Sequence, residues 1–125
     1  MRTVHTRDAP EPVGPYSQAI VVDNMVFTSG QIGIEPSTGG LESGVEAQTE
    51  RCLKNLEAVL KEAGTSIQRV IRCTLYITDI SRFKDVNEAY SRFFHVSNAP
   101  ARVTVGVASL PLGASIEIEA IALLD

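Results

Sequence analysis

The sequence predicts an α+β fold in which two helices cover one face of a single mixed β-sheet. Two stretches carry apolar residues at spacings of three and four, as amphipathic helices do. Several shorter stretches alternate apolar and polar residues, as strands with one covered face do, and they lie on both sides of the helical stretches along the chain. The 125 residues are therefore expected to form one domain, residues 1–125, in the order ββ-α-β-α-ββ.

The N-terminal part is expected to form a β-hairpin. Residues 16–22 and 25–29 flank Asp23-Asn24, which is a turn signal between two apolar runs. The proline-rich residues 8–15 before the hairpin cannot join a sheet ladder, and residues 2–6 are a candidate for a further short strand.

The two apolar stripes predict two helices. Ser43 and Glu46 match a capping box, and the stripe that starts at Cys52 ends at Gly64. A second helix is expected over residues 81–94. Asn87 falls on its inner stripe, where a buried amide needs partners, so we expect Asn87 to bond nearby backbone in a structural role.

Three later strands are expected to turn their apolar residues toward the helices. The apolar sets are Ile71, Cys73, Leu75 and Ile77, then Val103, Val105 and Val107, then Ile116, Ile118, Ala120 and Ala122. The opposite face would carry Arg72, Tyr76, Arg102, Thr104, Glu117 and Glu119 together with the apolar Ile20, Val70 and Ile121. That face is too apolar to stay in water, so a second covering layer, most simply another subunit, is expected.

Composition disfavours several functions. Eleven Lys and Arg residues against fifteen Asp and Glu residues give a net charge of −4 without any basic cluster, which disfavours binding to nucleic acid. No apolar run approaches the roughly 20 residues that span a bilayer. Residues 1–5 lack the apolar core of a signal peptide, so a cytoplasmic protein is expected. Cys52 and Cys73 are expected to be buried, reduced thiols.

The histidines and glycines point to a site without metal or cofactor. His5 and His95 have no metal-ligand spacing, and neither completes a Ser-His-Asp or Cys-His set. No glycine-rich phosphate loop leads from a strand into a helix.

Arg102 and Glu117 are the strongest candidates for chemistry. Arginine grips a carboxylate through two parallel hydrogen bonds, and a poorly solvated glutamate can activate water. An ordinary structural ion pair is the alternative. If the last two strands formed a tight hairpin, the two residues would be about four residues, or roughly 13 Å, apart. Either these strands are not direct partners, or the site borrows a second chain.

Three further residues are candidates for lining this site. Tyr16 places a hydroxyl at a rigid Gly-Pro turn, although a packed surface tyrosine is the alternative. Ser29 and Gly30 end a strand, and the glycine allows a ligand to approach the backbone closely.

Six motifs in order resemble the RidA (YjgF) family of reactive-intermediate deaminases over essentially the whole chain. They are Gly14-Pro15-Tyr16-Ser17-Gln18-Ala19, Ser29-Gly30-Gln31-Ile32, Asn87, Pro100-Ala101-Arg102, Leu110-Pro111 and Ile116-Glu117-Ile118-Glu119-Ala120-Ile121-Ala122. The resemblance implies a chorismate-mutase-like fold and a homotrimer with sites between subunits. It also implies hydrolysis of 2-iminobutanoate and 2-iminopropanoate, which pyridoxal-phosphate-dependent dehydratases release, to 2-oxo acids and ammonia.

The resemblance also assigns roles to individual residues. Arg102 would bind the substrate carboxylate and Glu117 would position or activate water, while Tyr16, Ser29 and Gly30 would line the pocket. Thr104 stands where members carry Cys or Thr. Val103 departs from the Ser or smaller residue of many members.

Two other functions remain open. The family is also associated with ribonuclease activity and translation inhibition, which the acidic charge balance disfavours. A trimer without catalysis, either a sensor of small carboxylates or a chaperone-like protein, is the second.

Overall fold

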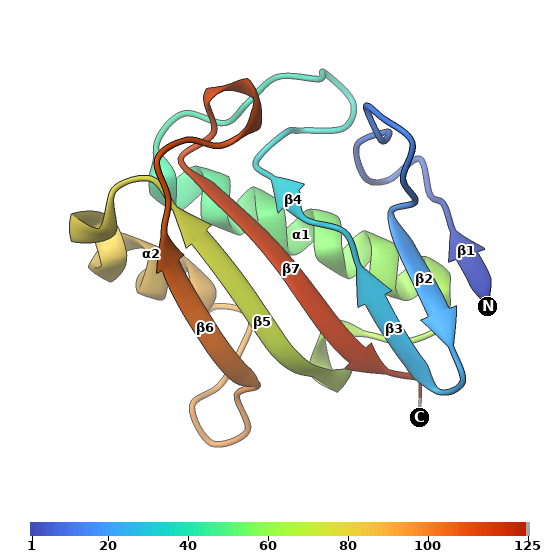
Figure 1. The fold of residues 1–125 in the computed structure, drawn as a ribbon. Helices are drawn as coiled ribbons and strands as arrows, with labels where there is room; N and C mark the ends of the chain where they lie inside the picture. Colours follow the sequence, from blue (N-terminus) through green and yellow to red (C-terminus); the bar gives the residue numbers. More distant parts are fainter. Residues whose placement is uncertain (125) are drawn as a thin grey trace.

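The computed structural model describes residues 1–124. Its strands are β1 (Arg2–Val4), β2 (Ala19–Val22), β3 (Met25–Thr28), β4 (Gln31–Ile32), β5 (Val70–Ile77), β6 (Ala101–Gly106) and β7 (Ile116–Leu123). Its helices are α1 (Val45–Ala63) and α2 (Phe83–Tyr90), with single 3-10 turns at η1 (Ile67–Arg69), η2 (Ile80–Arg82) and η3 (Pro111–Gly113). Figure 1 shows the longer helix, α1, running behind the sheet.

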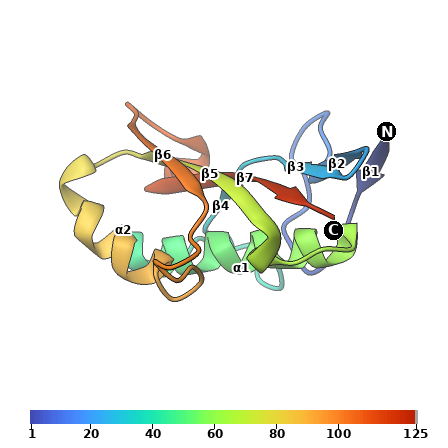
Figure 2. The same ribbon diagram turned by 90° about the horizontal axis from the view of Figure 1, so that it is seen from below.

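The strands form one sheet in the order β1-β2-β3-β7-β5-β6, and β4 pairs with β7 beside β3. The pairing of β5 with β6 is parallel, whereas the other pairings are antiparallel. Both helices lie on the same side of this sheet (Figure 2). The predicted fold class, a mixed sheet with two helices on one face, is therefore confirmed.

Apolar side chains from the sheet and from α1 fill the space between the two layers. The largest fully buried ones are Leu53, Leu56, Leu60, Leu75, Ile77, Ile116 and Ile118. Cys52 and Cys73 are free thiols in this core, as predicted. None of the helices in the described part of the chain is long and apolar enough to cross a membrane.

The hairpin and the first helix show how local sequence sets the element boundaries. Val22 pairs with Met25 across the predicted turn, where Asp23 takes a left-handed φ of 53°. At the end of α1, Gly64 is also left-handed, with a φ of 100°, and its N–H donates to the Lys61 carbonyl.

Two helix predictions were wrong in detail. The capping box does not form, because Gly44 is the N-cap residue of α1 and no side chain caps this end. Glycine reaches the φ of 90° found there without strain. The second helix covers residues 83–90 rather than 81–94, since a 3-10 turn precedes it and turns follow it.

A β-bulge in β5 overturns the predicted orientation of its first two residues. The register with β7 shifts between Val70 and Arg72. Because a bulge inserts one unpaired residue, Val70 turns into the core and Ile71 is left 41% exposed.

The predicted orientation of β6 was also wrong. Arg102 is paired with Cys73, and paired residues of neighbouring strands point to the same face. Cys73 is fully buried beneath the helices, so Arg102 and Thr104 point to the helix side. Val103 and Val105 lie on the open face, 39% and 37% exposed. Strand β6 is at the sheet edge beside the short helix α2, where alternation alone does not tell which face is covered.

The open face therefore has a different composition from the one predicted. It carries Ile20, Val22, Met25, Phe27, Arg72, Thr74, Tyr76, Ala101, Val103, Val105, Glu117, Glu119, Ile121 and Leu123. Among the residues that the structure describes, one hydrogen bond joins two polar side chains on this face: the Tyr76 hydroxyl donates to Glu119 Oε1 at 2.7 Å. Apolar side chains such as Phe27, 38% exposed, surround this pair.

Gly33 provides a test of how tightly β4 is packed on α1. A Cβ at this position would lie 2.7 Å from the Gln48 Cα atom, which is backbone and cannot rotate away. We expect Gly33→Ala to lower the free energy of unfolding by about 1–3 kcal/mol, as overpacking does. Urea unfolding at matched protein concentration would measure this. Gly40→Ala is the control, because its Cβ would meet only the Thr38 Oγ1 atom, at 3.4 Å. Equal stability of both variants would contradict the expectation.

Candidate active site

The pairing of β4 with β7 brings the Ser29–Gly30 segment against Glu117. Ile32 pairs with Glu117 and Gln31 pairs with Ile118. The Glu117 side chain then lies directly on the Gly30 backbone, since a Cβ at residue 30 would be 2.5 Å from Glu117 Oε2. Glycine at position 30 is therefore a steric requirement of this arrangement.

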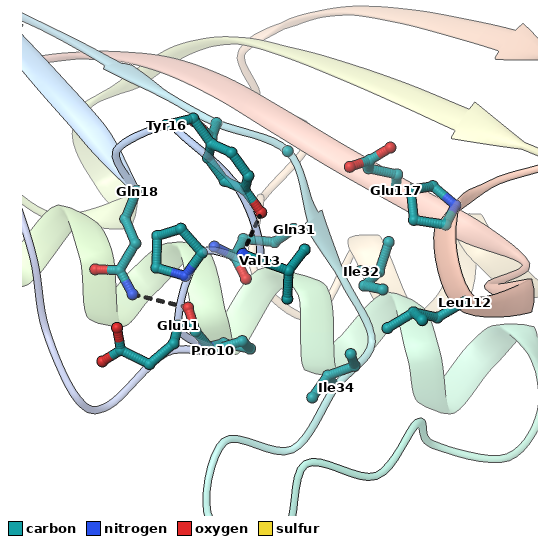
Figure 3. Close-up of a pocket in the computed structure, with 14 residues that line it drawn as sticks. Pro10, Glu11, Val13, Tyr16, Gln18, Gln31, Ile32, Ile34, Leu112 and Glu117 are labelled. Carbon is teal, nitrogen blue, oxygen red and sulfur yellow. Dashed lines mark hydrogen bonds between the residues drawn. The ribbon is translucent and has the colours of Figure 1, made fainter.

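A cavity of about 410 Å³ opens beside this contact (Figure 3). Its walls come from the proline-rich loop, from the β3–β4 segment, and from the turn before β7. The lining residues are Pro10, Glu11, Pro12, Val13, Tyr16, Gln18, Ser29, Gly30, Gln31, Ile32, Ile34, Pro111, Leu112 and Glu117. The structure thus brings together four of the predicted residues, namely Tyr16, Ser29, Gly30 and Glu117.

The proline-rich loop is tied down by one buried amide. The Gln18 side chain is 1% exposed; its Oε1 accepts from the Thr6 N–H at 2.7 Å, and its Nε2 donates to the Pro10 carbonyl at 2.9 Å. The Ser29 hydroxyl donates to the Ser17 carbonyl and joins the same loop to β3. Tyr16 is half exposed, and its hydroxyl accepts from the Val13 N–H at 3.3 Å (Figure 3).

Glu117 is a half-buried carboxylate beside this cavity. The pKa of Glu117 is raised above its ordinary value of 4.5. The larger cause is partial burial, which disfavours the charged form, and the smaller cause is the negative charge of Glu119. Neither an arginine nor a lysine forms an ion pair with Glu117 among the described residues. A carboxylate with a raised pKa beside an open cavity can accept a proton from bound water.

Arg102 is not part of this cavity. Its guanidinium lies over the rings of Tyr90, at 4.8 Å, and Phe83, at 5.2 Å, and its Nη1 donates to Asn87 Oδ1 at 2.9 Å. Asn87 thus binds a side chain rather than the backbone that was predicted, and it is half-buried rather than buried. Thr104 is half-buried on the same face of β6, two residues further along.

Arg102 and Glu117 do not face each other within one chain. Strand β5 lies between β6 and β7, with Cys73 paired to Arg102 and Tyr76 paired to Glu117. Two strand spacings and three residues of offset separate the Cα atoms by roughly 14 Å, and the side chains leave opposite faces. An ion pair between these two residues is therefore excluded within the chain. The two strands are not direct partners, which was one of the two alternatives considered.

The remaining titratable side chains do not build a second centre. Burial raises the pKa of the Cys73 thiol to about 11 and also raises the pKa of Cys52, so both thiols stay protonated near neutral pH. His5 binds Glu11 at the exposed surface. No group of three or more His, Cys, Asp or Glu residues in the described chain is placed to hold a metal ion.

Sequence patterns did not identify the apolar wall of the cavity. Ile32 and Ile34 lie in and after a strand of two residues, and Leu112 lies in a turn, so no periodicity marks them. The buried amide of Gln18 was also missed, although a glutamine just before a predicted apolar strand is a detectable signal.

Known proteins resemble the chain over nearly its full length. Residues 6–124 match the family model described as endoribonuclease L-PSP. A RutC family protein of Aquifex aeolicus is 52% identical over 98% of this chain and 98% of that protein. The human 2-iminobutanoate/2-iminopropanoate deaminase is 46% identical over 98% of this chain and 89% of that protein. The chloroplastic Reactive Intermediate Deaminase A of Arabidopsis thaliana is 48% identical over 97% of this chain and 65% of that protein.

Solved structures agree in fold. The YjgF gene product of E. coli has a TM-score of 0.94, with 40% identity and full coverage of both chains. E. coli TdcF with bound serine has a TM-score of 0.93, with 41% identity and 98% of each chain covered. The chain belongs to the endoribonuclease L-PSP family, the family of the RidA (YjgF) proteins.

Proposed function

We propose that this protein hydrolyses 2-imino acids, such as 2-iminobutanoate and 2-iminopropanoate, to 2-oxo acids and ammonia. The observation that carries the proposal is the half-buried Glu117 carboxylate, with its raised pKa, lying on Gly30 at the edge of a 410 Å³ cavity. Relatives 46% and 48% identical that are named as deaminases support the choice of reaction. No cofactor is required, and the cytoplasm is the proposed location.

The reaction needs one base and one clamp for the substrate. Glu117 accepts a proton from water while the water oxygen adds to the carbon of the N-protonated imine, which gives a tetrahedral amino alcohol. Glu117 then returns that proton to the nitrogen, and the carbon–nitrogen bond breaks with release of ammonia. The hydroxyl proton passes to Glu117 as the carbonyl forms, and ammonia takes it up as ammonium. Tyr16, Ser29 and Gly30 line the space in which the substrate is oriented, and orientation supplies much of the acceleration.

The substrate carboxylate requires a positive charge that the cavity itself lacks. Arg102 is the candidate clamp, yet it lies on the other face of the sheet in the same chain. We therefore propose a homotrimer in which Arg102 and Thr104 of one subunit complete the cavity of the next. The apolar open face, with Phe27, Val103 and Val105 each more than a third exposed, supplies a surface for such assembly.

The proposed substrates are products of other enzymes. Free 2-imino acids arise when pyridoxal-phosphate-dependent dehydratases release their products. We propose that the protein works downstream of such enzymes. The net charge of −4 favours this small-molecule role over a ribonuclease.

The direct test is the rate of imine loss. Purified protein is added to a threonine dehydratase that releases 2-iminobutanoate, and semicarbazide traps the imine that remains. Wild type is expected to reduce the trapped imine, and Glu117→Gln to lose roughly 10²-fold in kcat/KM, because general-base catalysis supplies about that factor. Glu57→Gln, on the exposed surface of α1, is the matched control. A wild type that only binds 2-oxo acids would instead be a carboxylate sensor.

Mixing two inactive variants tests the shared site. Arg102→Ala chains keep Glu117, and Glu117→Ala chains keep Arg102. When equal amounts are unfolded and refolded together, random assembly around a ring leaves about one quarter of the interfaces with both wild-type residues. Activity is expected to return to about one quarter of wild type. No recovery in mixed trimers, with both variants correctly assembled by light scattering, would contradict a site shared between chains.

The pH profile tests the role of Glu117 as a base. Because only the deprotonated carboxylate accepts a proton, kcat/KM is expected to fall as the pH is lowered through the raised pKa of Glu117. Glu119→Gln removes a negative charge that raises this pKa, so the acidic limb should move to lower pH. The amide keeps an acceptor for the Tyr76 hydroxyl. An unmoved limb would show that another group controls the rate.

A further inference from the structure

The cavity beside Glu117 extends into a part lined by apolar side chains. Ile32, Ile34 and Leu112 lie together on one side of the pocket in Figure 3, and Val13 lies between them and Tyr16. Two of these side chains are strongly exposed, since Leu112 is 69% and Val13 84% accessible. They come from different loops and flank the same cavity, so apolar surface is concentrated next to the reacting end of the site.

Leu112 has a backbone conformation that leucine disfavours. Its φ of 58° and ψ of 22° are left-handed, and the next residue, Gly113, is left-handed as well, with a φ of 72°. Glycine or asparagine adopts this conformation at lower cost. The leucine side chain is not buried in the core, so neither the turn nor the packing of the chain calls for leucine here. A strained residue at the edge of a binding cavity points to a use in binding.

The size of the cavity exceeds the need of the smallest substrates. Its volume of about 410 Å³ lies within the range of pockets that enclose drug-sized ligands, roughly 300–1,000 Å³. 2-Iminopropanoate carries only a methyl group beyond its reacting carbon and would leave the apolar walls in contact with water. A longer alkyl chain would displace that water, and each fully buried methylene would strengthen binding roughly fourfold.

We propose that Leu112 determines substrate preference, and that the site takes 2-imino acids with long apolar side chains in preference to 2-iminopropanoate. The inference rests on the proposed deaminase function. Glu117 and Gly30 hold the reacting carbon at one end, and the side chain of the substrate extends along Ile32 and Ile34 under Leu112. The side chain of the substrate then lies against Leu112 and Val13.

The test compares two substrates in the same protein. An amino-acid oxidase with catalase releases 2-iminohexanoate from norleucine or 2-iminopropanoate from alanine, and semicarbazide traps the imine that remains. The quantity is the ratio of kcat/KM for the long substrate to that for the short one. Wild type is expected to give a ratio of about ten, the gain from burying part of three extra methylenes.

Two variants remove the apolar contact without disturbing the turn. Leu112→Gly fits the left-handed conformation, and Leu112→Asn tolerates it while placing a polar group in the pocket. Both are expected to lower the ratio about fivefold or more, with an unchanged circular dichroism spectrum. Val96→Gly is the matched control, because Val96 is 97% exposed and lies outside the cavity, and it should keep the wild-type ratio.

The outcomes separate this inference from the function on which it rests. If 2-iminopropanoate is hydrolysed and the ratio is the same in wild type and both variants, the deaminase stands and the role of Leu112 is wrong. If neither imine is hydrolysed faster than in buffer, the proposed function fails and the inference fails with it. If Leu112→Gly keeps the ratio but changes the mass measured by light scattering, Leu112 serves contact between subunits, and the inference is also overturned.

Discussion

The close approach of the Glu117 carboxylate to the Gly30 backbone is the constraint on which the site depends. It follows from the register of a strand only two residues long, β4, against the first half of β7. Any Cβ at residue 30 would enter the space of the carboxylate. Because the carboxylate lies against protein backbone, it loses part of its water, and this desolvation is the first cause of its raised pKa. A packing requirement at one glycine thus sets the chemistry of the base.

The walls of the cavity depend on polar groups that are themselves buried. Gln18 occupies a nearly solvent-free position and satisfies backbone groups of Thr6 and Pro10, which fixes a loop too rich in proline to pair with a strand. Ser29 bonds the same loop from the strand that leads to Gly30. The loop with Tyr16 and the Ser29–Gly30 segment are therefore held together by these side chains and by the backbone hydrogen bond from the Ser29 N–H to the Gln18 carbonyl.

Alternation in the sequence predicted the strands well where both neighbours are paired. Strand β7 lies inside the sheet, and its predicted core face, with Ile116 and Ile118, is the buried one. The pattern failed at Ile71, where a bulge shifts the register, and along β6, which is an edge strand. Alternation in a sequence indicates that the two faces of a strand differ in polarity, but it does not indicate which of those faces a short helix covers. The apolar pocket wall around Leu112 lay outside any periodic element, so its place required the three-dimensional structure.

The separation of Arg102 from Glu117 gives the site a property that a direct pair would destroy. An arginine bonded to Glu117 would lower the pKa of that carboxyl and leave a structural ion pair in place of a base. Instead, Arg102 is held against Tyr90, Phe83 and Asn87 on the helix side of the edge strand. In the proposed trimer the guanidinium meets the cavity of another subunit with the substrate carboxylate between it and Glu117. The guanidinium then pairs with the substrate carboxylate rather than with Glu117, so Glu117 remains basic. Arg102 can bind the substrate in this way only in the assembled trimer.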